Sequence, residues 1–281
     1  MKHQEGTFRG IRDASIYYQY WLPEGESKAV LLIVHGLAEH SGRYMNVVNY
    51  FVPLGYAVYG IDHVGHGKSD GTRVYLKRFE DFTEMLKIYF DMVRNWQPNR
   101  PIFLIGHSLG GLISAAYLLD HQAGLTGAVL SGPAIKVHET ISPTAIFVSK
   151  VLSALVPKRG LMKLEAEGVS RDPTVVQAYV NDPLVCHGKI TARLSAELVK
   201  TVRRVTAEAN KIALPILILQ GSADKVVDPE GAQMLYNTVS SADKTIKTYD
   251  GLYHEVYNEP EHHQVLGDVK AWLEAHLGPR S

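Results

Sequence analysis

Short apolar runs recur along the chain and alternate with longer stretches of mixed polarity. The runs are rich in β-branched residues and lie at Ala29–Val34, Tyr56–Ile61, Ile102–Ile105, Gly127–Leu130, Ile216–Leu219 and Lys244–Tyr249. Runs of this kind are typical of strands that helices cover on both faces, as in parallel sheets. We therefore predict an α/β fold with a mostly parallel central sheet flanked by helices.

The strand pattern stops between Pro133 and about Thr206. Apolar residues there recur at three- and four-residue intervals, which predicts helices over Thr140–Val156 and Thr191–Ala207. We expect residues 1–132 and 207–281 to form the core of the fold and residues 133–206 to form an inserted helical cap.

Glycine and histidine follow the ends of the predicted strands. The segments concerned are HG at 35–36, DHVGHG at 62–67, GHS at 106–108, GSAD at 221–224 and GLYH at 251–254. The carboxyl ends of parallel strands meet at one edge of a sheet, which is where such folds bind ligands. We expect these segments to converge there.

Ser108 is the first candidate for chemistry at this edge. It is the centre of GHSLG at 106–110, a Gly-x-Ser-x-Gly pattern placed between a predicted strand and a predicted helix. Such a turn exposes a nucleophilic serine, and its glycines allow close approach of neighbouring backbone. The alternative is a serine that simply begins a helix.

A nucleophilic serine needs a histidine to take its proton and a carboxylate to orient that histidine. After this kind of turn the chain order is serine, acid, histidine. Asp224 follows the strand at 216–219, and His254 follows the next strand. We therefore predict a catalytic triad of Ser108, Asp224 and His254.

Other residues compete for these roles. Asp228 lies four residues after Asp224, but it precedes Pro229 at the start of a predicted helix, where helix capping explains it. His262 and His263 fall in a helical stretch, and His121 lies at a helix end.

The motifs together resemble the α/β-hydrolase fold and, within it, the monoacylglycerol lipase family. The resemblance covers most of the chain and is carried by HGLAEHSGRY at 35–44, DHVGHGKS at 62–69, GHSLGG at 106–111, QGSAD at 220–224 and YH at 253–254. It implies hydrolysis of lipid esters, above all of monoacylglycerol to glycerol and fatty acid, through an acyl-enzyme and without a cofactor.

The resemblance also implies further site residues. The backbone N–H groups of Leu37 and Leu109 would form the oxyanion hole, where such donors stabilise the developing charge. Glu39 and Arg43 would belong to the substrate-binding region around the polar end of the site, and Tyr179 in the cap would meet the glycerol hydroxyls. For Glu39 and Arg43 the alternative is that they pair with each other and hold their loop.

One position departs from the family pattern. Tyr257 stands where relatives can carry a second histidine after the catalytic one, so the side chain available for glycerol recognition at this position differs. His63 and His66 have a spacing that suits metal binding, but ligands beyond Asp62 are missing nearby, so we expect a structural loop and no metal.

The composition of the chain indicates which kinds of partner and which cellular location to expect. Lys plus Arg and Asp plus Glu each number 29, so no net charge favours nucleic acid. Cys186 is the only cysteine and the first ten residues lack an apolar signal segment, which favours a cytoplasmic protein. The apolar stretch at 141–156 is too short to span a bilayer, but it is suited to peripheral membrane contact through the cap. The oligomeric state stays open.

Two rival functions remain at this point. A general carboxylesterase or a lysophospholipase would use the same three residues on another ester. A ligand-binding protein would share the fold without the chemistry, because fold alone does not define function.

Overall fold

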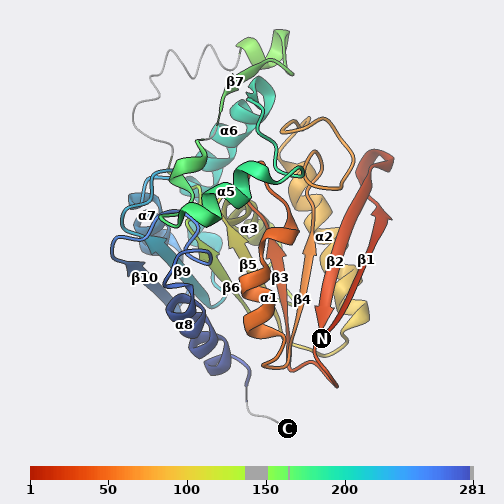
Figure 1. The fold of residues 1–281 in the computed structure, drawn as a ribbon, viewed down its shortest axis with the longest axis vertical. Coiled ribbons are helices and arrows are strands. Elements are labelled where there is room, and N and C mark those ends of the chain that lie inside the picture. Colours follow the sequence, from red (N-terminus) through yellow and green to blue (C-terminus); the bar gives the residue numbers. More distant parts are fainter. Residues whose placement is uncertain (137–150, 164, 279–281) are drawn as a thin grey trace.

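Eight strands form one central sheet in the computed structural model, which describes residues 1–136, 151–163 and 165–278 (Figure 1). The strands are Lys2–Arg9 (β1), Ser15–Leu22 (β2), Ala29–Val34 (β3), Tyr56–Ile61 (β4), Ile102–His107 (β5), Gly127–Ser131 (β6), Ile216–Gly221 (β9) and Lys244–Tyr249 (β10). They lie in the order β1-β2-β4-β3-β5-β6-β9-β10. The six neighbouring strands β4, β3, β5, β6, β9 and β10 are parallel, which confirms the predicted fold class.

The inner strands β3, β4, β5, β6 and β9 are buried on both faces, which explains why they are apolar at successive positions. In β3, Val30 and Leu32 join the hydrophobic cluster on one face. Leu31 and Ile33 join the cluster on the other face. Side chains alternate between the two faces of a strand. A strand that is covered on both faces therefore needs apolar residues at odd and at even positions.

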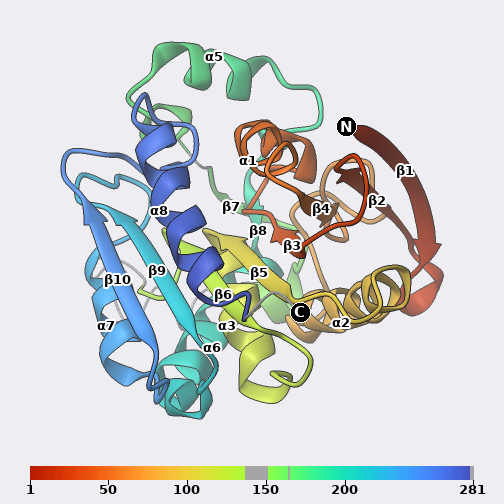
Figure 2. The same ribbon diagram turned by 90° about the horizontal axis from the view of Figure 1, so that it is seen from below.

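Helices form the two covering layers (Figure 2). They are Met45–Phe51 (α1), Glu80–Trp96 (α2), Leu109–Asp120 (α3), Ala192–Glu208 (α6), Glu230–Thr238 (α7) and His262–Ala275 (α8). A further helix, Pro173–Asn181 (α5), lies apart from these layers in Figure 2. Short 3₁₀ turns lie at Ile11–Asp13, Ser41–Arg43, Ala166–Gly168 and Ala209–Lys211. Residues of α1 and α8 pack on one face of the sheet, and residues of α2, α3, α6 and α7 pack on the other.

The two N-terminal strands were not predicted from the sequence. β1 is an edge strand whose residues are mostly exposed, so it lacks the apolar run that marked the inner strands. β2 pairs antiparallel with both β1 and β4. It buries Ile16 and Trp21, but tyrosine and glutamine between them break the apolar run.

The segment that follows β6 leaves the sheet, as the sequence pattern indicated. α6 matches the helix expected over Thr191–Ala207 to within one residue at each end. Of the helix expected over Thr140–Val156, residues 140–150 lie outside the described part of the chain. A short two-stranded sheet, formed by Gly160–Met162 (β7) and Ile190–Thr191 (β8), was not expected. The division into a core and a cap over 133–206 stays a prediction.

Candidate active site

Ser108 lies at a sharp turn between β5 and α3. Its backbone angles are φ 55° and ψ −119°, a combination that residues with side chains rarely adopt and that costs about 1–3 kcal/mol. Hydrogen bonds hold this turn: the N–H of Ser108 donates to the Ser131 carbonyl at 2.9 Å, and the Ser108 carbonyl accepts from the Ala134 N–H at 3.1 Å. The serine is thus fixed at the carboxyl end of a central strand.

The glycines of this motif allow α3 to begin directly against the sheet. A Cβ on Gly110 would lie 1.8 Å from the carbonyl oxygen of Val34. A Cβ on Gly106 would lie 2.5 Å from the hydroxyl oxygen of Ser114. Any larger residue at either position would push the helix away from the strands and move Ser108 with it.

Asp224 and His254 come together from the ends of β9 and β10. The Nδ1 of His254 lies 2.8 Å from the Oδ2 of Asp224, and both side chains are buried. Asp224 also accepts hydrogen bonds from the N–H groups of Val226 and Val227 and from the side-chain amide of Gln220. Burial opposes the ionisation of Asp224, but His254 and the two backbone donors outweigh it and lower the pKa of the carboxyl group. An ionised Asp224 holds the N–H of the imidazole at Nδ1.

Asp228, the competing acid, is bonded elsewhere. Its carboxylate accepts from the backbone N–H of Glu230 at 2.9 Å and lies 2.8 Å from the ammonium group of Lys136. These contacts lie at the start of α7, the capping position that the sequence indicated.

The turn at Ser108 lies beside the imidazole of His254. Gly132 follows Ser131, the acceptor of the Ser108 N–H, and a Cβ on Gly132 would be 3.1 Å from His254 Nδ1. The ring of His107 lies 4.6 Å from the ring of His254, measured between centroids. The Ser108 hydroxyl makes no hydrogen bond with any residue that the structure describes. In enzymes this bond is often formed only when substrate is present.

The loop after β3 borders the serine from the other side. A Cβ on Gly36 would lie 3.3 Å from the Cβ of Ser108. Leu37 follows on this loop, and Leu109 is the first residue of α3. Within the described ranges, neither backbone N–H of these two leucines donates a hydrogen bond. Both groups are thus free to bind an oxyanion, and that role stays a prediction.

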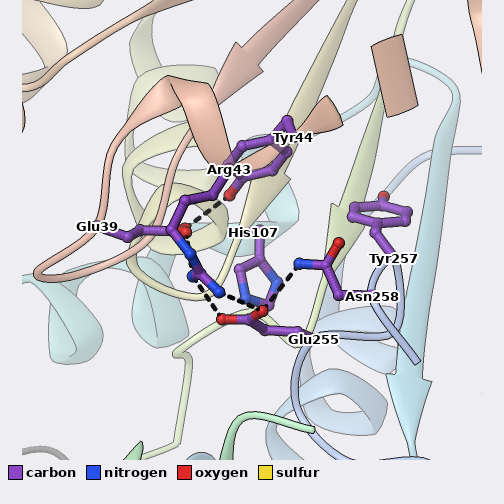
Figure 3. A pocket seen from close by; sticks show the side chains of 7 residues that line it. All are labelled: Glu39, Arg43, Tyr44, His107, Glu255, Tyr257 and Asn258. Carbon is purple, nitrogen blue, oxygen red and sulfur yellow. Dashed lines mark hydrogen bonds and ion pairs between the residues drawn. The ribbon is translucent and has the colours of Figure 1, made fainter. Parts of the chain in front are cut away.

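Glu39 and Arg43 contact each other (Figure 3). This contact was the alternative to a role of the two residues in binding glycerol. Arg43 donates to Glu39 at 2.8 Å and also forms two hydrogen bonds with Glu255, at 2.7 and 2.9 Å. The other oxygen of Glu39 accepts from the hydroxyl of Tyr44 at 2.8 Å and from the N–H of Gly36 at 2.6 Å. All three charged side chains are less than 10% exposed.

Burial and charge affect the two carboxylates of this cluster differently. Burial opposes the ionisation of Glu255, but the Arg43 guanidinium outweighs it and lowers the pKa of that group. Burial dominates for Glu39 and raises its pKa. Burial beside His254 lowers the pKa of His107 to about 3, so this histidine is neutral near pH 7.

Tyr179 reaches the same cluster from α5. Its ring lies 4.7 Å from the guanidinium carbon of Arg43, and the side chain is buried. A cavity of about 10 Å³ lies within the cluster, enough for about one water molecule. Its lining residues are Glu39, Arg43, Tyr44, His107, Glu255, Tyr257 and Asn258.

Glu255 is the main residue that the sequence reasoning missed. It directly follows His254, and a carboxylate that is buried beside a predicted catalytic histidine needs a cationic partner. The sequence did not indicate which cation that would be, because Arg43 lies 212 positions away.

Two backbone contacts connect the segment around α5 to these loops. The N–H of Glu255 donates to the carbonyl of Val169 at 2.8 Å. The N–H of Cys186 donates to the carbonyl of Ala38 at 2.7 Å. The segment thus contacts both the loop after β10 and the loop after β3, and α5 lies beyond this end of the sheet in Figure 1.

The histidines after β4 bond to backbone carbonyls of their own loop and of the loop after β3. His63 Nε2 lies 3.1 Å from the carbonyl of His35, and His66 Nδ1 lies 3.1 Å from the carbonyl of Val64. Among the described residues, no group of three or more His, Cys, Asp or Glu side chains has an arrangement that could hold a metal ion. In the same residues, no helix is both long and apolar enough to cross a bilayer.

The sheet order, the strained serine between β5 and α3, and an Asp–His pair beyond the last two strands define the α/β-hydrolase class. The model of the family described as "Serine aminopeptidase, S33" matches residues 25–261. The chain therefore belongs to this family of α/β-hydrolases.

Individual relatives narrow this further. A monoacylglycerol lipase of Mycolicibacterium smegmatis is 39% identical over 273 residues, which cover 97% of this chain and 98% of the relative. The monoglyceride lipase of Rattus norvegicus is 34% identical over 92% of this chain and 86% of its own. The crystal structure of the Paleococcus ferrophilus monoacylglycerol lipase superimposes with a TM-score of 0.83 at 32% identity, covering 93% of this chain and 99% of that one. The chain is thus a carboxylic ester hydrolase similar to monoacylglycerol lipases.

Proposed function

We propose that this protein hydrolyses monoacylglycerols to glycerol and free fatty acid, with Ser108, His254 and Asp224 as its catalytic triad. The contact that carries the proposal is the hydrogen bond of 2.8 Å between His254 and Asp224, beside the strained turn at Ser108. The substrate class is supported by the relatives named as monoacylglycerol and monoglyceride lipases.

The chemistry proceeds in two halves. The Ser108 oxygen attacks the ester carbonyl while His254 takes the hydroxyl proton, and the N–H groups of Leu37 and Leu109 bind the oxyanion. His254 then protonates the departing glycerol oxygen, which leaves an acyl group on Ser108. Water, deprotonated by His254, attacks this acyl-enzyme. His254 then returns the proton to the Ser108 oxygen as its bond to the acyl group breaks, which releases the fatty acid. Asp224 holds the imidazole tautomer and stabilises its charged form throughout.

The polar end of the substrate site is the finer part of the proposal. For Tyr179 and Glu39 we predict a role in binding the glycerol group. For Arg43 this role competes with the alternative that it holds its loop. Both terminal nitrogens of Arg43 already bind carboxylates, which supports the loop-holding alternative for this residue.

Substrate preference is the test of this function. Hydrolysis of a monoacylglycerol is measured beside the matching triacylglycerol, a short p-nitrophenyl ester and an aminoacyl p-nitroanilide, with wild type and Ser108→Ala. We expect wild type to prefer the monoacylglycerol and Ser108→Ala to be inactive. Cleavage of the short ester alone would indicate a general carboxylesterase, and cleavage of the anilide would indicate peptidase activity. Full activity of Ser108→Ala would disprove the triad.

Peripheral membrane contact is a separate proposal. Lipid esters are collected from interfaces, and apolar side chains in the expected cap are exposed, including Leu155 at 75% and Met162 at 55%. We expect a cytoplasmic protein that floats with phosphatidylcholine liposomes, and we expect Leu155→Asp to weaken this association. No flotation with or without monoacylglycerol in the bilayer would contradict it.

A further inference from the structure

Glu255 connects the residue after His254 to another loop of the active site. Its carboxylate forms the two-pronged ion pair with Arg43, at 2.7 and 2.9 Å. The side-chain amide of Asn258 donates to the same carboxylate at 2.8 Å, and the backbone N–H of Glu255 donates to Val169. Glu255, the residue next to His254, is therefore held through both its main chain and its side chain.

The contact continues beyond Arg43 to the predicted oxyanion hole. Arg43 donates to Glu39, and Glu39 accepts from the N–H of Gly36. Gly36 directly precedes Leu37, whose N–H is the predicted oxyanion donor. A continuous chain of charge-assisted hydrogen bonds, which are the stronger kind, thus links the loop of the base to the loop of the oxyanion donor.

Stability alone does not account for this arrangement. Removing two carboxylates and a guanidinium from water is costly, and buried ion pairs are often no more stable than apolar residues of similar volume. A two-pronged pair does fix distance and orientation, because the planar guanidinium and the carboxylate match in one geometry. In catalysis, a misplacement of 1 Å costs about 100-fold in rate.

We propose that Glu255 and Arg43 are a pair of positioning residues that set His254 relative to the oxyanion loop, and that neither binds the glycerol group. The proposal rests on the proposed function, since it assumes that His254 is the base. It predicts a loss in the chemical step for every ester, whatever its alcohol. Glycerol binding predicts a loss confined to monoacylglycerols.

The first experiment compares Glu255→Gln with the control Glu261→Gln. Both carboxylates lie on the segment after His254 and pair with an arginine, but Glu261 is 43% exposed and pairs with Arg171 at the surface. For Glu255→Gln we expect kcat to fall about 10- to 100-fold on both a monoacylglycerol and a p-nitrophenyl ester, with KM little changed. Labelling of Ser108 by a small fluorophosphonate should slow in parallel. Glu261→Gln should behave as wild type.

A second variant keeps the proposal testable if Glu255→Gln folds poorly. Arg43→Lys retains the charge but loses the two-pronged geometry, and we expect the same loss in kcat. The double variant should be no slower than the slower single variant, because both disrupt one contact.

Other outcomes overturn the proposal. A rise in KM for the monoacylglycerol alone, with the short ester unaffected, would assign Arg43 and Glu255 to substrate binding. Labelling and kcat equal to those of the control would remove any role in positioning. A different result would disprove the proposed function itself: equal reaction of wild type and Ser108→Ala with the fluorophosphonate.

Discussion

Gly132 lies against the imidazole of His254, where a Cβ would be 3.1 Å from Nδ1 and 3.2 Å from Cε1. The same Cβ would be 3.4 Å from Oδ2 of Asp224. Gly132 follows β6, and the preceding residue accepts the backbone hydrogen bond of Ser108. The absence of a side chain at this position lets the serine turn and the Asp–His pair approach each other.

Gly132→Ala should therefore reduce activity. The methyl group would displace the imidazole by a few tenths of an ångström, and we expect kcat to fall about tenfold. Gly25→Ala is the control, because Gly25 also has a positive φ but no neighbour within 4 Å of its Cβ position. Both variants should lose about 1 kcal/mol of stability from the strained backbone, while only Gly132→Ala should lose activity. Equal kinetics for the two variants would contradict the steric argument.

The strained backbone at Ser108 predicts a stability difference between two inactive variants. Glycine adopts the conformation of φ 55° and ψ −119° without strain, whereas alanine keeps the clash of its Cβ. Ser108→Gly should thus be more stable than Ser108→Ala by about 1–2 kcal/mol. Urea unfolding of the two variants measures this difference, and equal midpoints would mean that the turn relaxes at little cost.

The assignment of the acid predicts a contrast between Asp224→Asn and Asp228→Asn. Asparagine at 224 would no longer hold the required tautomer of His254, and we expect kcat to fall by about 10⁴-fold. Asparagine at 228 can still cap α7, since its side-chain oxygen can accept from the N–H of Glu230. Its activity should match that of wild type. The reverse pattern in steady-state hydrolysis would make Asp228 the acid.

Two buried histidines predict a loss of stability in mild acid. Burial lowers the pKa of His66 to about 4 and that of His107 to about 3. Both values lie below the ordinary 6.5, so between pH 6.5 and about 4 the unfolded chain binds protons that the folded protein does not. The stability that each group contributes is complete above about pH 6.5 and falls as the pH decreases, by about 2 kcal/mol per histidine between pH 7 and 5.

Urea unfolding at pH 7 and pH 5 measures this loss. His66→Gln removes one titrating group, so the variant should lose about 2 kcal/mol less than wild type over the same interval. An identical pH dependence in both proteins would mean that His66 is protonated in the folded state as well.

Local pattern determined the fold class and the three candidate catalytic positions. Strands covered on both faces must be apolar at successive positions, so the inner strands were visible as short runs. The turn at Ser108 requires glycine on both sides because α3 meets the sheet there. These glycines lie within the six residues 106–111, so the turn could be recognised from a local motif. Asp224 and His254 were identified because each lies in the loop that follows a strand. The edge strand β1 escaped detection, since an exposed edge imposes no apolar run.

Only the tertiary structure decided the contacts between loops that lie far apart in the sequence. Arg43 and Glu255 are 212 positions apart, and no local signal pairs them. Their contact arises because β3 and β10 deliver loops to the same end of the sheet, where burial forces each charge to find a partner. The same holds for Tyr179 over Arg43 and for Gly132 beside His254. The residue type at a position depends on the local backbone conformation and on burial, so it can be interpreted from the sequence. The partner of a buried charge depends on which loops the fold brings together.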